Sequence, residues 1–509
     1  MNNVIVSPHH LSTAAGSEIF KLGGNAVDAA IATNLIQGIV APETCGIGGD
    51  LFALIWDPNK NQPDFLDASG YAGSLADVKK LKQFKTIPLN HPLSVTVPGA
   101  VAGWYELSSK YGKLKIESIL NLGIELCHEG FLINDELYSS LDMFREELSG
   151  HPSGYSFYRN NLPIEAGTRI RRPQLGKTLE RLRDNGVDYF YKGEIASEIS
   201  NAVGGAITMQ DLSEYQSEWR KPLHQNIFGY DGWTSPPSTQ GYLTLSSLKG
   251  VELINEDSTT LHSLIESYRI FAADRDNITF DYKNKINNFV GNDLSYIEEK
   301  IKSFNSKKSG IFNFPNPHGG GTAYMTTVDS SGLGVSLIQS NFYGIGSRIG
   351  VGRHGFFLHN RGCGFNLVED HPNCIEPRKK PLHTLSPTIW SKNGKLEFII
   401  GTRGGRHQPQ LLIQAILPYI KENKSFKNII KLPRWVIDNF ESNQVSNLRF
   451  ENISKETLDK LTSLGHKINN ENKYVKGFGP ISVIYKKSDG FFEGVNDFRV
   501  GTEKTFNSF

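Results

Sequence analysis

The chain has few cysteines, no excess charge of either sign and no long apolar run, and each shortage excludes a class of protein. Its 509 residues include four cysteines, none of them in a C-x-x-C pair, which excludes a disulfide scaffold. Lysine and arginine number 54 against 53 aspartates and glutamates. The chain therefore has no global field that favours nucleic acid or an acidic membrane surface.

Membrane, nucleotide and metal motifs are also missing. No stretch approaches the roughly 18 apolar residues of a membrane span, and the N-terminus lacks the basic and apolar pattern of a signal peptide. There is no G-x-x-x-x-G-K-[ST] loop, residues 344–350 lack dinucleotide-loop spacing, and His9, His10 and His371 lack zinc spacing. We expect a soluble cytoplasmic protein with no nucleic-acid or membrane partner, no metal and no organic cofactor.

Glycine is abundant, with 50 residues, many of them in doublets that suggest tight turns and close backbone approach. The pair Gly23-Gly24 separates two predicted helices, and Asn25 is placed to cap the second. Residues 26–40 are apolar on nearly all sides, which predicts a buried helix. Residues 100–300 predict mainly helices and loops.

The composition changes before residue 322. Residues 301–321 are rich in Lys, Ser, Asn, Pro and Gly, which predicts a mobile linker. The pattern then becomes typical of strands at 324–328, 333–339 and 396–400, followed by a helix at 411–420. We expect a helix-rich first part, a linker and a sheet-building second part.

The glycine run 319–321 leads directly into Thr322. A threonine inside a chain is a poor nucleophile, whereas at a chain N-terminus its own α-amino group can act as the base. That amine titrates at about 7.7–8.0 when unperturbed, so much of it is free base near neutral pH. Self-cleavage between Gly321 and Thr322 would therefore create a nucleophile and a base on one residue. The alternative for this segment alone is an ordinary glycine-rich turn before a strand.

Motifs along most of the chain resemble the γ-glutamyltransferase family, whose members are N-terminal nucleophile hydrolases that cut themselves into two subunits. The motifs are Ala-Ala-Gly at 14–16, Gly-Gly-Asn-Ala-Val-Asp-Ala-Ala at 23–30, Gly-Ile-Gly-Gly at 46–49, Val-Pro-Gly-Ala at 97–100, Gly-Gly at 204–205, residues 212–215, Pro-Pro at 236–237, His262, Ala-Asp-Arg at 273–275, Leu-Ser-Pro-Thr at 385–388 and Gly-Thr-Arg-Gly-Gly at 401–405. The resemblance implies an α+β fold, a four-layer αββα sandwich shared by fragments 1–321 and 322–509, which remain associated as a heterodimer.

The resemblance also implies catalytic roles. Thr322 matches the nucleophile, and Ser340 falls where the family has a threonine whose hydroxyl assists it. Gly404 and Gly405 match the pair whose backbone N–H groups form the oxyanion hole. One such donor contributes on the order of 3–4 kcal/mol to barrier reduction. Gly321 lacks a Cβ, which suits the distorted geometry of an N-to-O acyl shift. The alternative for Gly404-Gly405 is a plain turn after a strand.

The departures from the family lie in the clamp for the glutamyl α-carboxylate and α-amino groups. The first-fragment segment 67–72 has no arginine, and Gly364 stands where an aspartate is expected. The other altered positions are Phe342, Arg361 and the pair His383-Thr384. Loss of a charge partner from a buried ionic group typically costs several kcal/mol. We therefore expect the chemistry to be retained and the acyl specificity to be changed.

Arg361, Arg403 and Arg406 lie close in sequence to the expected site. They can bind an acidic acyl group, as in the related glutaryl-type cephalosporin acylases, or pair with structural carboxylates. His383 can contact substrate or be a hydrogen-bonded structural residue. The expected partner is a small-molecule amide or γ-glutamyl-type substrate. A second class stays open, in which the chain is an unprocessed, catalytically silent relative that serves as a binding protein.

Overall fold

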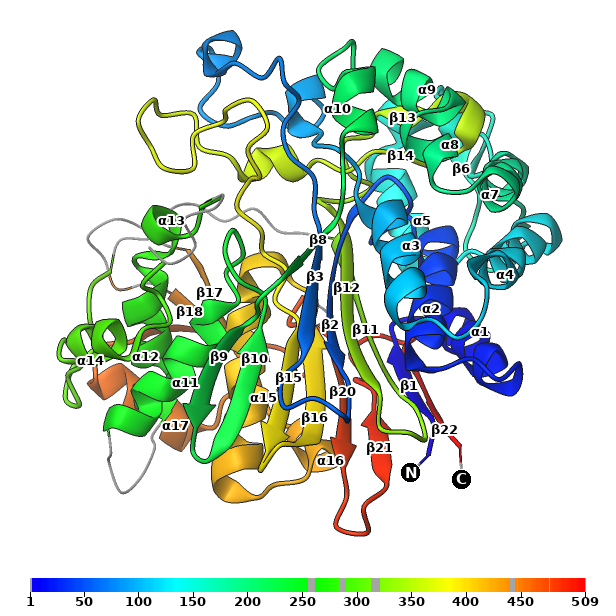
Figure 1. Ribbon diagram of the computed structural model, residues 1–509. Helices are drawn as coiled ribbons and strands as arrows, with labels where there is room; N and C mark the ends of the chain where they lie inside the picture. Colours follow the sequence, from blue (N-terminus) through cyan, green and yellow to red (C-terminus); the bar gives the residue numbers. More distant parts are fainter. Residues whose placement is uncertain are drawn as a thin grey trace.

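Two antiparallel sheets lie face to face with helices on both outer faces (Figure 1). The computed structural model describes residues 2–254, 261–282, 289–312, 321–439, 445, 447–475 and 477–508. The arrangement is a four-layer αββα sandwich, which confirms the α+β prediction. No helix in these ranges is long and apolar enough to cross a membrane.

The first sheet has seven strands in the described part of the chain and draws on both halves of the sequence (Figure 1). Its central strands carry the Gly321–Thr322 junction. In spatial order its members are β22 (Lys504–Asn507), β1 (Val4–Ser7), β11 (Gly321–Val328), β12 (Gly334–Phe342), β2 (Asp50–Trp56), β3 (Asp64–Ala68) and β8 (Glu218–Arg220).

The second sheet has six described strands, and again both halves contribute. An apolar cluster that includes Val6, Phe52, Ile338 and Ile399 fills the space between the sheets. In spatial order the members are β21 (Phe492–Val495), β20 (Ile481–Lys486), β16 (Lys395–Thr402), β15 (Thr388–Lys392), β10 (Tyr230–Thr234) and β9 (Leu223–Ile227).

Helices from residues 10–185 lie on the side of the first sheet, and later helices cover the second (Figure 1). Covering the first are α1 (His10–Lys21), α2 (Ala26–Val40) and α3 (Ala100–Tyr111), with α4 (Ile116–Glu129) and α7 (Pro173–Asn185) outside them. Covering the second are α11 (Tyr242–Ile254) and α15 (Gln408–Glu422), with α12 (Leu261–Ala272) and α14 (Leu294–Ile301) outside them.

Shorter elements complete the described fold. The helices are α5 (Asp135–Met143), α6 (Arg145–Leu148), α8 (Asp188–Tyr191), α9 (Glu194–Ala202), α10 (Met209–Ser213), α13 (Arg275–Ile278), α16 (Phe426–Ile429) and α17 (Lys455–Ser463). The strands are β4 (Phe131–Leu132) with β7 (Arg169–Ile170), β5 (Tyr158–Arg159) with β6 (Leu162–Pro163), β13 (Gly350–Val351) with β14 (Phe356–Phe357), and β17 (Trp435–Asn439), β18 (Asn447–Glu451) and β19 (Lys467–Glu471).

The sequence correctly predicts the buried helix α2 and its N-terminal cap. Every residue of α2 is buried, and Asn25 caps it in a reciprocal pair of hydrogen bonds with the Asp28 backbone and side chain. The expected helix-rich first part is confirmed, because α1 to α14 precede residue 321, and the second part supplies strands to both main sheets as expected. Strands β1 to β3 and β8 to β10 of the first part also enter these sheets. Of the expected linker, residues 313–320 lie outside the described ranges.

Candidate active site

The Gly321–Thr322 junction lies at the start of β11, opposite the end of β12. Thr322 is the register partner of Ser340, Gly321 is that of Phe342, and the ladder is irregular between residues 321 and 322. The Ser340 hydroxyl donates to the Gly321 carbonyl oxygen at 2.6 Å and accepts from the Phe342 N–H at 2.8 Å. Thr322 Oγ1 lies 3.3 Å from Ser340 Oγ. The Ser340 hydroxyl therefore contacts both the Gly321 carbonyl and the Thr322 hydroxyl.

Gly321 is held where no larger residue fits. A Cβ at this position would lie 2.3 Å from the Glu43 carbonyl oxygen and 3.1 Å from that of Gly344. Both neighbours are backbone atoms, which cannot rotate away as a side chain can. The glycine is thus required by close backbone approach, in addition to the flexibility expected from the sequence.

Gly404 and Gly405 form the bend between β16 and α15. Their φ angles are +125° and +56°, conformations that L side chains rarely adopt. The buried Gln240 amide donates to the carbonyl oxygens of Gly405 and Thr384, each at 2.9 Å, and so fixes the bend. Because Gly405 begins the 3₁₀ turn that runs into α15, its N–H lies at a helix N-terminus, which favours negative charge. Their oxyanion role stays a prediction.

A cavity of about 500 Å³ joins the junction to this bend. Gly321, Gly404, Arg403, Glu43 and Glu136 are among its lining residues. Arg403 Nη1 lies 2.6 Å from Glu136 Oε1, so the arginine stands at the cavity already paired with a carboxylate.

Arg361 has a buried structural partner that the sequence does not reveal. Its Nε donates to Asp50 Oδ2 at 2.9 Å, and both side chains are fully buried. Burial acts to raise the pKa of Asp50, but the Arg361 guanidinium beside it, the largest opposing influence, helps to hold that pKa well below its usual range. The guanidinium also covers the Phe342 ring, with 4.3 Å from Cζ to the ring centroid. Of the two possibilities that the sequence leaves open for Arg361, this structure shows the pairing with a structural carboxylate, Asp50.

His383 is sealed beside the same ion pair. Its side chain is fully buried, with its ring 4.9 Å from that of Phe52. Burial, followed by repulsion from Arg361, lowers the pKa of His383 to about 3, so the ring is neutral near physiological pH. A substrate contact by His383 or Arg361 stays a prediction, and neither is among the residues that line the two large cavities at the site.

A second cavity, of about 440 Å³, is lined by Phe342, Gly364, Thr384 and Arg406. Its other charged lining residues are Lys85, Arg275 and Asp276. Burial, and next the neighbouring Arg275, lower the pKa of Arg406 to about 9. Three of the altered clamp positions, Phe342, Gly364 and Thr384, are thus brought to one cavity that carries an excess of cations.

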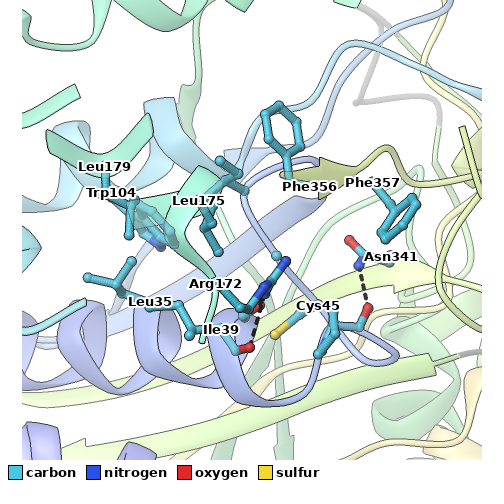
Figure 2. A pocket seen from close by; sticks show the side chains of 14 residues that line it. Leu35, Ile39, Cys45, Trp104, Arg172, Leu175, Leu179, Asn341, Phe356 and Phe357 are labelled. Carbon is cyan, nitrogen blue, oxygen red and sulfur yellow. Dashed lines mark hydrogen bonds between the residues drawn. The ribbon is translucent and has the colours of Figure 1, made fainter. Parts of the chain in front are cut away.

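Buried polar contacts fix the glycine-rich loop between α2 and β2 (Figure 2). The Arg172 guanidinium donates to the carbonyl oxygens of Gly38 at 3.2 Å and Ile39 at 3.0 Å, which are the last turn of α2. The Asn341 side-chain amide donates to the Pro42 carbonyl at 3.0 Å, and its backbone N–H donates to Thr44 at 3.1 Å. The loop that carries Glu43 is therefore tied to β12 beside the junction.

Only one cluster among the described residues, His262, Glu266 and His466, has ligand atoms close enough for a metal ion, within 4.8 Å of one another. The two imidazoles are hydrogen-bonded to each other at 2.7 Å, and Glu266 accepts from Arg269 at 2.7 Å and from the Gly310 N–H at 2.7 Å. The atoms that could bind a metal ion are therefore already hydrogen-bonded, and the Arg269 guanidinium places a positive charge beside them. We interpret the cluster as a structural link between α12 and the residues after α17.

The sandwich and the threonine at the head of a central strand define an N-terminal nucleophile hydrolase. The family model described as Gamma-glutamyltranspeptidase matches residues 12–506. The chain therefore belongs to the γ-glutamyltranspeptidase family, and it is an enzyme of the amidohydrolase and acyltransferase type.

Relatives share its length as well as its sequence. The glutathione hydrolase-like YwrD proenzyme of Bacillus subtilis is 30% identical, over 97% of this chain and 96% of that protein. The oxamate amidohydrolase proenzyme of Klebsiella pneumoniae is 29% identical, over 97% of both chains. The crystal structure of cephalosporin acylase from Bacillus halodurans matches with a TM-score of 0.89 and 27% identity, covering 99% of this chain and 95% of that one.

Proposed function

We propose that the chain cleaves itself between Gly321 and Thr322, and that Thr322 then transfers acyl groups from amides to water or an amine. The observation that carries the proposal is the Ser340 hydroxyl, hydrogen-bonded to the Gly321 carbonyl at 2.6 Å and 3.3 Å from the Thr322 hydroxyl. Its hydrogen bond polarises the carbonyl under attack, as an oxyanion donor does. The relatives described as proenzymes support the same proposal.

The steps follow from these positions. Thr322 Oγ1 attacks the Gly321 carbonyl carbon, the C–N bond breaks, and the Thr322 nitrogen takes up the proton to become an amine. Water then hydrolyses the resulting ester. The freed amine serves as the base that activates the same threonine against a substrate amide. The acyl-threonine formed in that reaction is resolved by water or by an acceptor amine.

Purified wild-type protein should migrate as two fragments, the shorter one starting at Thr322, whereas Thr322→Ala should remain a single chain with no amidase activity. Denaturing electrophoresis and N-terminal sequencing after timed incubation distinguish the two. A wild-type chain that stays intact at several pH values and temperatures would instead favour the silent relative. Fragments 1–321 and 322–509 should stay associated because both sheets draw strands from each side of the junction.

For the acyl group, we propose an acidic chain without an α-amino group, such as the half-amide of a dicarboxylic acid. The cavity shared by Phe342, Gly364 and Thr384 supports this, because Lys85, Arg275 and Arg406 outnumber its carboxylate Asp276. Asp276 lies 3.9 Å from Arg406 and is bonded more closely to Arg275. A substrate carboxylate in this cavity could form a charge-assisted hydrogen bond with the largely buried guanidinium groups of Arg275 and Arg406. The names of the oxamate amidohydrolase and the cephalosporin acylase fit an amide whose acyl part is not γ-glutamyl.

We expect kcat/KM for glutaryl-p-nitroanilide to exceed that for γ-glutamyl-p-nitroanilide by about tenfold or more. The reason is that the ammonium group of the γ-glutamyl substrate would be repelled by the cationic side chains of the cavity. Arg406→Gln should lower kcat/KM for the glutaryl substrate by about 10- to 100-fold through loss of a charge-assisted contact. Neutral butyryl-p-nitroanilide is the internal control, since its turnover should change little. Equal efficiency on glutaryl and γ-glutamyl substrates would contradict the acyl assignment while leaving self-cleavage intact.

A further inference from the structure

Glu43 is a buried carboxyl group at the junction to which the family resemblance assigns no role. It lies on the loop between α2 and β2, the residue is 5% exposed, and it lines the cavity that also reaches Gly321 and Gly404. Its Oε2 has no hydrogen-bond partner within the described part of the chain. A buried polar atom without a partner is costly and calls for an explanation, such as a catalytic role.

The backbone around Glu43 fixes it against the acyl side of the junction. The Glu43 carbonyl oxygen is so close to Gly321 that a Cβ there would lie 2.3 Å from it. The flanking residues Pro42 and Thr44 are bonded to Asn341, which follows Ser340 in β12. The Glu43 backbone, the Gly321 carbonyl and the Ser340 hydroxyl are thus all tied to the same end of β12.

Charged groups from three other elements act on Glu43. Burial and then Glu136, on α5, raise the pKa of Glu43 to about 8, while Arg403, after β16, and Arg172, at the start of α7, act in the opposite direction. Asp135 lines the same cavity next to Glu136. Glu43 is therefore mainly protonated at neutral pH and becomes a carboxylate, and hence a base, as the pH rises through about 8.

We propose that the Glu43 carboxylate activates the water molecule that hydrolyses the Gly321–Thr322 ester, an inference that rests on the self-cleavage proposed above. The cavity of about 500 Å³ far exceeds the about 10–15 Å³ that one water requires. The water oxygen bonds to the Gly321 carbonyl carbon while Glu43 takes a water proton. The bond from that carbon to Thr322 Oγ1 then breaks, and Glu43 returns the proton to the threonine oxygen. The products are the Gly321 carboxylic acid and the free Thr322 hydroxyl.

The experiment follows ester accumulation in Glu43→Gln, an isosteric change whose amide cannot accept the proton. Fresh wild-type precursor and variant are incubated from pH 6 to pH 10, with and without hydroxylamine, which cleaves esters but not amides. Wild-type ester hydrolysis should rise about tenfold per pH unit and level off above pH 8. The variant should accumulate ester, lose that inflection, and hydrolyse it on the order of 100-fold more slowly, while hydroxylamine should restore cleavage at residue 321.

Two companion variants test the assignment in other ways. Asp135→Asn removes an exposed carboxylate from the same cavity, and it should not accumulate ester. Glu136→Gln removes the carboxylate that raises the pKa of Glu43 and should move the wild-type inflection to lower pH. This second measurement remains decisive if Glu43→Gln fails to fold, because an unmoved inflection would overturn the inference.

Other outcomes separate the inference from the self-cleavage itself. A Glu43→Gln chain that matures at the wild-type rate with an unchanged pH profile overturns it. So does a variant that stays intact and insensitive to hydroxylamine beside a wild type that matures, because Glu43 would then act before the ester forms. A wild type that never yields fragments refutes the proposed function directly, and the role of Glu43 falls with it.

Discussion

Gly321→Ala should fold but fail to mature, with self-cleavage slowed by more than about 100-fold. The added Cβ would meet the Glu43 carbonyl oxygen at 2.3 Å and the Gly344 carbonyl oxygen at 3.1 Å. Since neither backbone atom can move without its loop, the start of β11 must shift and the Gly321 carbonyl must leave the Ser340 hydroxyl. A misplacement of about 1 Å between reacting groups can cost about 100-fold in rate.

The measurement is the rate of fragment formation by denaturing electrophoresis, with Gly150→Ala as the matched control. A Cβ at Gly150, also outside the left-handed region, meets nothing within 4 Å, so that variant should mature like wild type. Circular dichroism must show that both variants keep the wild-type fold. Normal maturation of folded Gly321→Ala would mean that the close approach at the junction is not needed for the acyl shift.

Asp50→Asn should destabilise the protein by about 3–5 kcal/mol, because it leaves the Arg361 guanidinium buried without its counter-charge. Both side chains are fully buried, with Nε and Oδ2 2.9 Å apart. Activity should fall as well, since Asp50 is the register partner of Ser340 across β2 and β12. Urea unfolding followed by fluorescence measures the change in the free energy of unfolding.

The double variant Asp50→Asn/Arg361→Met separates an unpaired charge from a loss of packing. Removal of both charges should leave the protein closer to wild type than Asp50→Asn alone, because an uncompensated buried charge costs more than an absent pair. The result to compare is the free energy of unfolding. If Arg361→Met lowers it as much in the Asp50→Asn background as in the wild type, the two residues act independently. The ion pair would then not be the source of their effect.

The sequence predicts those parts of the site that depend on neighbours along the chain. Gly321 and Thr322 stand out because a glycine run meets a strand pattern, and the helix 26–40 stands out because nearly all of its residues are apolar. Asp50 is different, since its partner Arg361 is 311 residues away in the sequence. A lone aspartate after a glycine pair gives no local sign of a buried counter-charge. The family resemblance supplies the sandwich, which periodicity alone does not.

Other features were missed for physical reasons of the same kind. Strands β8, β9 and β10 are short and lie within a stretch whose sequence predicts mainly helices and loops. β8 pairs with β3 and β10 pairs with β15, partners that are distant in the sequence, whereas β9, among the described strands, joins the sheet only through its hairpin with β10. Glu43 has no catalytic pattern around it. Its raised pKa arises from burial and from Glu136, which only the folded chain brings together.

Strand β1 lies between β22 and β11, paired antiparallel to each. In a chain cut after Gly321, a strand of the first fragment would therefore be threaded between the first and last strands of the second. Cleavage would change which residues are covalently joined and leave the hydrogen-bond ladder as it was. Separation of the fragments would then require opening the sheet on both sides of β1, so that dissociation and unfolding would be the same event.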